Sequence, residues 1–373
     1  MIVCGEPSGD LNASELAKKL LQINPQLKIT GVGGALLKDV ASQIYCDIKE
    51  LACFGVFDVL KKLPRFLALQ KLLLQKIRQD KPDALILVDF SGFNLRLAKK
   101  VNKVLPVIYY TSPQVWASRS GRVETIKKYV DKMLVFFKFE EEFYRKHGFK
   151  AEFVGSPLLD IVHPSTEKEI FLKEHGLLSS RTTIALLPGS RKSEVNNILP
   201  VMLKASSLLN RKIKDIQFVI AKSTQVDLKF YEEKMRGNDL LIEIVEGKTY
   251  DCLNSCDFAL VASGTATLET AILEKPFLII YKMGLLNYLL YSPQVKVPFI
   301  GIVNIISGRK IIPELVQFQA TAKNIAAEAG EIITDRQRSN AMKESLVKVK
   351  SLLGDKGASS RAAKIILDYL KIK

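Results

Sequence analysis

The fold is decided by the stretch Leu260–Ile272, which reads LVASGTATLETAI. It starts inside a short apolar run, Asp257–Ala262, which is typical of a strand buried in a parallel sheet. From Thr265 onward the apolar residues follow a helical period, and Ser263 and Gly264 lie at the joint. A strand that leads through small residues straight into a helix predicts an α/β fold that binds its ligand at the strand ends.

This joint predicts a nucleotide-binding site. Gly264 has no Cβ, so a ligand could approach the backbone there, and the free N–H groups of the helical turn that begins at Thr265 favour an anion such as a diphosphate. Glu269 lies about one turn further along, where its carboxylate could accept hydrogen bonds from both hydroxyls of a ribose. The structural alternative is a set of small helix-capping residues followed by a solvated glutamate.

The rest of the chain repeats this pattern in two series. The first begins with the glycine-rich turn Gly5–Asp10 (GEPSGD), and the second begins with the turn Pro188–Arg191 (PGSR). Pro, Gly and Ser interrupt the pattern at Gly155–Ser165, which marks a linker. We therefore expect two Rossmann-like domains that face each other across a cleft.

A chain of 373 residues is too long for one ordinary core, which agrees with this division. We expect the N-terminal domain to cover residues 1–160 and the C-terminal domain to cover residues 161–340. Residues 341–373 should form helices that pack back toward the N-terminal domain.

The composition limits the class of partner and the compartment. The 55 Lys and Arg against 39 Asp and Glu give a net charge of +16, which indicates nucleic acid, a phospholipid surface or a phosphorylated substrate. Five cysteines without metal-type spacing favour free thiols in a reducing compartment. The sequence starts without a signal-peptide pattern, and no apolar run is long enough to span a bilayer, so we expect a cytoplasmic protein.

Asp89 is the best candidate for acid–base chemistry. It ends the buried strand Ala84–Asp89 (ALILVD), and a carboxylate at the C-terminal end of a parallel strand faces the ligand crevice. The alternative is that Asp89 caps the next helix, which the intervening Ser91 and Gly92 disfavour.

The segment Val56–Gln79 predicts a pair of helices interrupted at Pro64. Its apolar residues cover a wider arc than one core-facing stripe needs, and basic residues border them. Such a surface suits the headgroup boundary of an anionic bilayer, although a covering loop or a homodimer interface would also account for it. The predicted membrane or acyl-chain residues are Phe57, Val59, Leu60, Leu63, Phe66 and Leu67.

Six motifs follow one another along the chain in this order: GEPSGD, the Asp89 strand with FSGFN, SPQVWA, LLPGSR, LVASGTATLE and IIPELVQ. Together they resemble the lipid-A-disaccharide synthase family, from residue 1 to about residue 320. The resemblance implies the glycosyltransferase-B architecture. It also implies an inverting enzyme that joins a UDP-linked 2,3-diacylglucosamine to 2,3-diacylglucosamine 1-phosphate and releases UDP, without a metal or cofactor. Such an enzyme would associate peripherally with the inner face of the inner membrane.

The resemblance also implies residue roles. Asp89 matches the proposed general base. The implied nucleotide-binding residues are Ser8, Gly9, Gly189, Ser190, Arg191, Ser263, Gly264, Thr265, Glu269 and Asn304. Two departures stand out. Met1 falls inside the first strand, which suggests a misplaced start or a shortened edge, and Ser91 and Gly92 replace a common Pro and second acid, so a second carboxylate cannot be required there.

Three alternatives remain open. The nearest is another glycosyltransferase-B enzyme that uses UDP-N-acetylglucosamine on a polyprenyl lipid. A sugar-nucleotide 2-epimerase of the same fold would need additional acids in the cleft. A nucleic-acid-binding protein would explain the charge of +16, but the basic residues are spread over many helices and no nucleic-acid module is recognisable. We therefore expect a UDP-sugar donor, an acylated sugar-phosphate acceptor and an anionic membrane surface as partners, and no nucleic acid.

Overall fold

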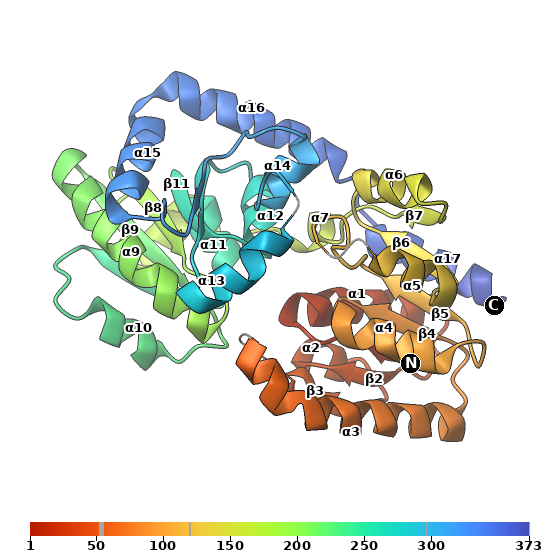
Figure 1. Ribbon diagram of the computed structural model, residues 1–373. Coiled ribbons are helices and arrows are strands. Elements are labelled where there is room, and N and C mark those ends of the chain that lie inside the picture. The colour runs from red at the N-terminus through yellow and green to blue at the C-terminus, as the bar shows by residue number, and fades with distance from the viewer. Residues whose placement is uncertain (52–55, 119–120, 296, 373) are drawn as a thin grey trace. The chain divides into compact units, whose positions relative to one another are not determined.

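The computed structural model describes residues 1–51, 56–118, 121–295 and 297–372, without the side chains of residues 56–62 and 291. The chain divides into two compact units, each built on its own parallel sheet (Figure 1). Unit 1 comprises Met1–Asp160, Gln294–Val297 and Leu353–Lys373. Unit 2 comprises Ile161–Pro293 and Pro298–Leu352. The predicted α/β class with two Rossmann-like domains is confirmed.

The sheet of unit 1 has seven strands in the order β3-β2-β1-β4-β5-β6-β7. They are β1 (Ile2–Val3), β2 (Thr30–Gly33), β3 (Gln43–Asp47), β4 (Leu85–Val88), β5 (Val107–Tyr110), β6 (Lys132–Val135) and β7 (Ala151–Phe153). The strand order reverses at β1 and β4, which pair in parallel through Val3 and Leu87. A reversal of this kind opens a ligand crevice at the C-terminal strand ends. The turns that contain Gly9 and Asp89 both lie there.

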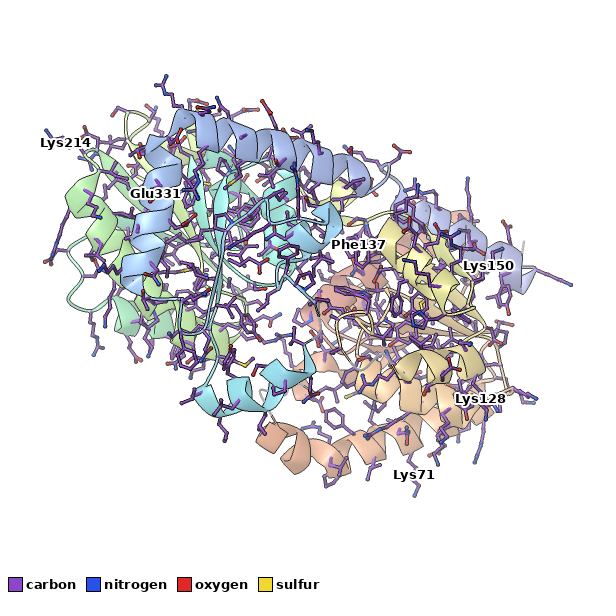
Figure 2. The ribbon with its side chains drawn as sticks, turned by 45° about the horizontal axis from the view of Figure 1, so that its top comes forward. Lys71, Lys128, Phe137, Lys150, Lys214 and Glu331 are labelled. Atoms are coloured by element: carbon purple, nitrogen blue, oxygen red, sulfur yellow. The ribbon has the colours of Figure 1, made fainter. Side chains whose placement is uncertain are left out.

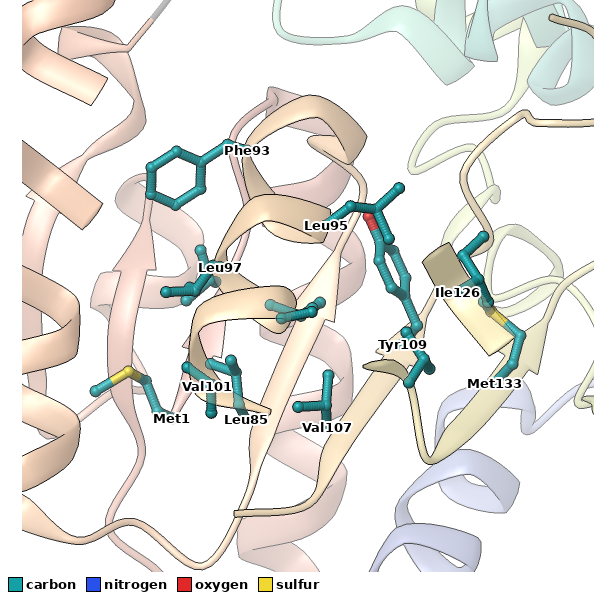
Figure 3. Close-up of a cluster of buried hydrophobic side chains, with 14 of the residues drawn as sticks. Met1, Leu85, Phe93, Leu95, Leu97, Val101, Val107, Tyr109, Ile126 and Met133 are labelled. Carbon is teal, nitrogen blue, oxygen red and sulfur yellow. The ribbon is translucent and has the colours of Figure 1, made fainter. Parts of the chain in front are cut away.

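Helices cover both faces of this sheet. One face packs against α3 (Val56–Asp80), α4 (Ser91–Val101), α5 (Arg122–Tyr129) and α6 (Lys138–Lys146). The other face packs against α1 (Pro7–Ile23), α2 (Ala35–Lys38) and the C-terminal helix α17 (Ala358–Leu370). Figure 3 shows part of the first cluster, in which Phe93, Leu97 and Val101 of α4 lie over Leu85 and its neighbours. Because both faces are covered at the centre of the sheet, the strands β1, β4 and β5 are apolar and buried along their whole length, as the sequence indicated.

Unit 2 has a six-stranded parallel sheet in the order β10-β9-β8-β11-β12-β13. Its strands are β8 (Thr182–Leu187), β9 (Ile216–Lys222), β10 (Ile242–Glu246), β11 (Phe258–Ala262), β12 (Phe277–Tyr281) and β13 (Glu314–Val316). Its helices are α8 (Lys168–Glu174), α9 (Lys192–Lys212), α10 (Leu228–Met235), α11 (Thr249–Ser255), α12 (Thr265–Ile272), α13 (Leu285–Tyr291), α14 (Ile302–Ser307), α15 (Ala322–Thr334) and α16 (Arg336–Leu352). The strand order reverses at β8 and β11, so the PGSR turn and the Gly264 joint follow the two central strands.

Helix α3 differs from its prediction. The segment forms one helix over Val56–Asp80 with Pro64 inside it, where the sequence predicted two helices. Leu69, Leu73 and Ile77 recur at every fourth position and are buried in the core of unit 1. Packing of this face stabilises the helix as a whole, because most helical stability in proteins comes from tertiary contacts.

Basic side chains lie on many elements of the surface. Lys71, Lys128 and Lys214 are exposed on α3, on α5 and just after α9, and they are marked in Figure 2. Among the residues that the structure describes, no helix combines the length and the apolar character needed to cross a bilayer.

Candidate active site

Asp89 occupies a strained turn at the end of β4. Asp89 and Phe90 both have left-handed backbone conformations, with φ of 50° and 45°. Each such residue costs of order 1–3 kcal/mol and persists only where its surroundings fix it. Phe90, and not Asp89, stands at the N-cap position of α4. The capping role that was the alternative for Asp89 is therefore not realised.

Hydrogen bonds from two buried side chains fix this turn. The Tyr109 hydroxyl donates to the backbone carbonyl of Asp89 at 2.6 Å, and Asn94 Nδ2 donates to the same carbonyl at 2.9 Å. Asn94 Nδ2 also lies 3.2 Å from the carbonyl oxygens of Val3 and Val88, so it joins the ends of β1 and β4. These hydrogen bonds fix the backbone of Asp89 and do not involve its carboxylate.

The glycine-rich turn of the GEPSGD motif packs directly against Asp89 and Phe90. A Cβ on Gly9 would stand 2.9 Å from Asp89 Oδ2, and a Cβ on Gly5 would stand 2.3 Å from the Phe90 ring. Both positions need glycine because of this close approach. Asp10, the last residue of the motif, accepts hydrogen bonds from the backbone N–H groups of Gly34, Leu36 and Leu37 at 2.6–3.2 Å. Gly5, Gly9 and Asp10 therefore have structural roles, while the half-buried Ser8 lies in the first turn of α1.

Burial sets the acidity of Asp89. Desolvation, together with the nearby charge of Glu6, raises the pKa of Asp89 to about 7. A carboxyl group with this pKa is substantially ionised near neutral pH and still basic enough to take a proton from a hydroxyl group. Glu6 was not singled out from the sequence, because its influence depends on the contact between two turns that are distant along the chain.

The loop that contains SPQVWA is fixed by Glu140 of α6, which the sequence also did not reveal. Trp116 Nε1 donates to Glu140 Oε1 at 3.1 Å, and the backbone N–H of Phe137 donates to its other oxygen. Desolvation raises the pKa of Glu140 to about 7. On the same side of the unit, Arg122 Nη1 donates to Ser91 Oγ at 3.0 Å, which places a guanidinium beside the turn that carries Asp89.

In unit 2, the joint between β11 and α12 leaves its backbone accessible. Gly264 has φ of 151° and ψ of −161°, a conformation that residues with side chains rarely adopt, and a Cβ there would meet no atom within 4 Å. Gly264 and Thr265 are exposed, and Ser263 is half-buried. The start of α12 at Gly264 and Thr265 thus lies at an open surface, and a helix N-terminus suits a phosphate.

Glu269 lies one turn into α12. The Tyr250 hydroxyl donates to Glu269 Oε1 at 3.3 Å. Desolvation raises the pKa of Glu269 to about 7, and the hydrogen bond from Tyr250 partly offsets this effect. Burial raises the pKa of Tyr250 as well, so it remains a hydrogen-bond donor at neutral pH. Tyr250 was not predicted, because nothing in the TYDCLNS sequence of α11 marks it as a partner of α12.

The PGSR turn holds its arginine through a glutamate of the same segment. Gly189 has φ of 112°, and the backbone N–H groups of Ser190 and Arg191 both point to Glu194 Oε2, at 3.0 and 3.2 Å. Arg191 Nη1 donates to Glu194 Oε1 at 3.0 Å. Glu194 stands three residues after Arg191, a spacing that the capping-box rule could have flagged.

Asn304 does not have the geometry of a nucleotide ligand. Its Nδ2 donates to the Ile312 carbonyl at 2.8 Å and to Glu314 Oε1 at 2.7 Å. Its Oδ1 accepts from the backbone N–H groups of Ile311 and Ile312 at 2.8 and 2.9 Å. All of its usual hydrogen-bonding capacity is therefore used inside unit 2. Asn304 holds the loop before β13 in this structure, and its contact to UDP stays a prediction.

The predicted membrane residues on α3 have different environments. Leu63 and Leu67 are 38% and 55% exposed. Phe66 instead packs against Phe90 and Phe93, with ring centroids 5.8 and 6.4 Å apart, so it connects α3 to the Asp89 turn. Three further residues have side chains outside the described part of the chain: Phe57, Val59 and Leu60.

Comparison with known proteins identifies the relatives of this chain. The profile of a family described as lipid-A-disaccharide synthetase matches residues 1–367. The lipid-A-disaccharide synthase of Syntrophus aciditrophicus is 40% identical over 373 residues, which span 100% of this chain and 97% of that protein. The synthase of Myxococcus xanthus is 37% identical over 371 residues, which span 99% and 97%.

Two solved structures show the same fold at low sequence identity. The S. aureus MnaA–UDP co-structure superposes with a TM-score of 0.69 at 16% identity, over 100% of this chain and 97% of that one. The calicheamicin glycosyltransferase CalG4 superposes with a TM-score of 0.62 at 14% identity, over 99% and 97%. The two parallel Rossmann-like sheets therefore have the fold of the glycosyltransferase-B class.

Within this class, the chain belongs to the lipid-A-disaccharide synthase family, as its match over the whole length shows. It is therefore a glycosyltransferase of lipid A biosynthesis, and the nucleic-acid-binding alternative is not favoured.

Proposed function

We propose that this chain transfers the sugar of UDP-2,3-diacylglucosamine to 2,3-diacylglucosamine 1-phosphate, with release of UDP. Unit 1, through residues 1–160, receives the acceptor, and unit 2, through residues 161–340, binds the donor. The observation that carries the proposal is Asp89, because a carboxyl group with a pKa raised to about 7 stands on a rigid, strained turn where the strand order of unit 1 reverses.

Asp89 acts as the general base. The acceptor hydroxyl attacks the anomeric carbon of the donor, a new C–O bond forms, and the bond from that carbon to the UDP oxygen breaks with inversion. The hydroxyl proton passes to Asp89 as the oxygen becomes nucleophilic. The fixed backbone of Asp89 supports this role because a base works best when its position is set in advance.

Unit 2 binds UDP and stabilises the charge on the departing diphosphate. The N-terminus of α12, where Gly264 and Thr265 are exposed, favours the phosphate oxygens together with Arg191. Glu269 accepts hydrogen bonds from the ribose hydroxyls. A guanidinium and a helix N-terminus can neutralise a leaving diphosphate, so no metal is needed, and activity should survive exhaustive chelation.

Both substrates carry acyl chains, so we also propose that the enzyme works at the surface of an anionic membrane, on its cytoplasmic side. The exposed Leu63 and Leu67 of α3, close along the helix to Arg65 and Lys71, support a peripheral mode of binding. The same surface could serve a homodimer, and the vesicle experiment described below distinguishes these two uses.

The test is a comparison of donors. With 2,3-diacylglucosamine 1-phosphate as acceptor, the enzyme should release UDP and form one disaccharide 1-phosphate for each UDP-2,3-diacylglucosamine consumed. UDP-N-acetylglucosamine, which lacks the acyl chains, should be turned over far more slowly. Equal turnover of the two donors would contradict the acyl-specific proposal, and conversion of UDP-N-acetylglucosamine without any acceptor would indicate an epimerase instead.

A further inference from the structure

Glu194 makes several hydrogen bonds to the PGSR turn, and the proposed function gives it no role. It lies in the first turn of α9, and its Oε2 accepts hydrogen bonds from the backbone N–H groups of Ser190 and Arg191. Its Oε1 accepts from Arg191 Nη1 at 3.0 Å. One carboxylate therefore binds both the backbone and the guanidinium of the arginine that we assign to the diphosphate.

The turn is built around this carboxylate. A Cβ on Gly189 would stand 2.5 Å from Glu194 Oε2, so glycine at this position makes room for Glu194 in addition to adopting φ of 112°. On the other side, Ser223 Oγ donates to the Ser190 carbonyl at 3.2 Å and ties the turn to the end of β9. Gly189 and Ser190, predicted as nucleotide contacts, are thus largely committed to holding Glu194 and the turn in place.

The arginine side chain remains accessible even though it is paired. The Arg191 side chain is 36% exposed, against 28% for Glu194. A guanidinium has five N–H donors in a planar fork, so it can hydrogen-bond to a carboxylate and to a phosphate through different donors. A carboxylate on one side of a guanidinium restricts its rotation and fixes the direction in which the other donors point.

We propose that Glu194 is a positioning residue that aims Arg191 at the diphosphate of the donor. This inference rests on the proposed role of Arg191 in binding UDP. A free arginine side chain must lose rotamer entropy when it captures a phosphate, and Glu194 removes most of that cost before the donor arrives. The benefit is largest when charge develops on the leaving diphosphate, because the electrostatic group is then already in position. A simple helix cap would instead contribute to stability alone.

The substitution Glu194→Gln separates these roles. A glutamine oxygen can still accept from the backbone N–H groups of Ser190 and Arg191, so the cap is largely kept. Its Nε2 then faces Arg191 Nη1, and two donors repel each other. We expect kcat/KM to fall roughly 10- to 100-fold, mainly through kcat, and the UDP dissociation constant to rise about tenfold or less. Binding of uridine, which has no phosphate, should change by less than about twofold.

The matched control is Glu169→Gln. Glu169 is exposed in the first turn of α8 in the same unit, so this variant removes the same charge at a comparable place in a helix. Its kcat/KM should equal that of the wild type. Thermal unfolding of both variants should occur within a few degrees of the wild type. A lower kcat/KM would then result from a misplaced Arg191 and not from a loss of folding.

A double-mutant cycle with Arg191→Ala decides the question. In the Arg191→Ala background, Glu194→Gln should change kcat/KM by less than about twofold, because there is no guanidinium left to position. If Glu194→Gln costs as much in that background as in the wild type, Glu194 is only a cap and the inference is overturned. If Arg191→Ala by itself leaves UDP binding and turnover intact, it is the proposed function of Arg191 that fails.

Discussion

At the scale of single residues, burial has a similar effect on two carboxyl groups to which we assign different roles. Desolvation raises the pKa of Asp89 in unit 1 and of Glu269 in unit 2 to about 7. In the proposed mechanism, Asp89 accepts a proton from the reacting hydroxyl, whereas Glu269 stays ionised and accepts hydrogen bonds from the ribose. Both roles require the deprotonated form, so both steps should weaken as the pH falls below about 7.

Replacing Asp89 with asparagine should separate binding from chemistry. The amide has the same shape but cannot take a proton, so kcat should drop by roughly a hundredfold or more while the UDP dissociation constant stays within a few-fold. In the wild type, kcat should rise with pH up to about 7 and then level off. Turnover of Asp89→Asn close to that of the wild type, measured with the acylated donor, would remove Asp89 from the mechanism.

The affinity for UDP should depend on the ionisation of Glu269. In the wild type it should increase as the pH rises through about 7, because the ionised carboxylate is the better acceptor for ribose hydroxyls. Glu269→Gln should weaken UDP binding by about 1.5–3 kcal/mol at pH 8, the scale of a hydrogen bond to a charged group. Calorimetric titrations at pH 6, 7 and 8 check both statements.

The control is 2′,3′-dideoxy-UDP, which lacks the ribose hydroxyls and should bind wild type and Glu269→Gln alike. An equal loss of affinity for UDP and for the dideoxy analogue would place the contact of Glu269 elsewhere.

At the scale of elements, the start of α1 and the turn after β4 pack directly against each other. Gly9 approaches Asp89 so closely that no side chain fits between them, and Asn94 of α4 binds carbonyls of both β1 and β4. Asp89, the proposed base, is therefore positioned by three elements at once. A substitution in any of these elements should therefore change the turnover rate, even if the substituted residue does not contact the substrate.

Gly9→Ala should lower turnover by displacing Asp89. Its Cβ would stand 2.9 Å from Asp89 Oδ2 and 3.3 Å from Cys4 Cβ, and a misplacement of a catalytic group by about 1 Å can cost about a hundredfold in rate. Gly92→Ala in α4 is the control, since a Cβ there meets no atom within 4 Å. That variant should keep full activity and gain up to about 1 kcal/mol in stability, because alanine favours helix. Similar kcat values for the two variants would argue against this coupling.

The exposed leucines of α3 should contribute to membrane binding. We expect Leu63→Ser with Leu67→Ser to reduce cosedimentation with anionic phospholipid vesicles roughly tenfold or more, because each buried leucine contributes about 1.5–3 kcal/mol. UDP binding should not change.

The paired control is Leu178→Ser with Leu241→Ser, two positions of unit 2 with exposures of 50% and 48%. It should leave vesicle binding intact. A loss of self-association in the α3 variant, with vesicle binding unchanged, would instead assign this surface to a dimer.

At the scale of the whole molecule, buried carboxyl groups link function to stability. Asp89, Glu140 and Glu269 all have pKa values raised to about 7, above their values in an unfolded chain. Between about pH 4.5 and 7 the native state therefore binds more protons than the unfolded state. The sign of this linkage means that the free energy of unfolding decreases as the pH rises through this range.

Thermal unfolding should show that these buried carboxyl groups destabilise the native state at high pH. The double variant Asp89→Asn with Glu140→Gln should unfold at a higher temperature than the wild type at pH 8, by a few degrees for each kcal/mol gained. At pH 4.5, where the carboxyl groups are protonated, the two proteins should unfold at nearly the same temperature. A temperature difference that does not depend on pH would contradict the linkage. The buried Met1 ammonium, whose pKa is lowered to about 6, is present in both proteins and cancels from the comparison.

The sequence by itself determined the architecture and the location of the important turns. The apolar run and the helical period of the opening stretch became β11 (Phe258–Ala262) and α12 (Thr265–Ile272), at the positions predicted. Periodicity is a local property, so elements with strong patterns can be predicted without tertiary information. The two glycine turns and the strand that ends at Asp89 were found in the same way. Pro64 misled the prediction for α3, because the buried face of a long helix outweighs one local penalty.

Only the tertiary structure decided which contacts each residue in those turns makes and how far its side chain is buried. Gly9, a predicted nucleotide contact, makes room for Asp89, which lies far away along the chain. Asn304 is hydrogen-bonded to its own loop, and Glu194 accepts a hydrogen bond from Arg191. The pKa values of Asp89 and Glu269 follow from burial, which is set by elements that pack from distant parts of the sequence. Desolvation and hydrogen bonding depend on neighbours in space, and a linear pattern does not specify those neighbours.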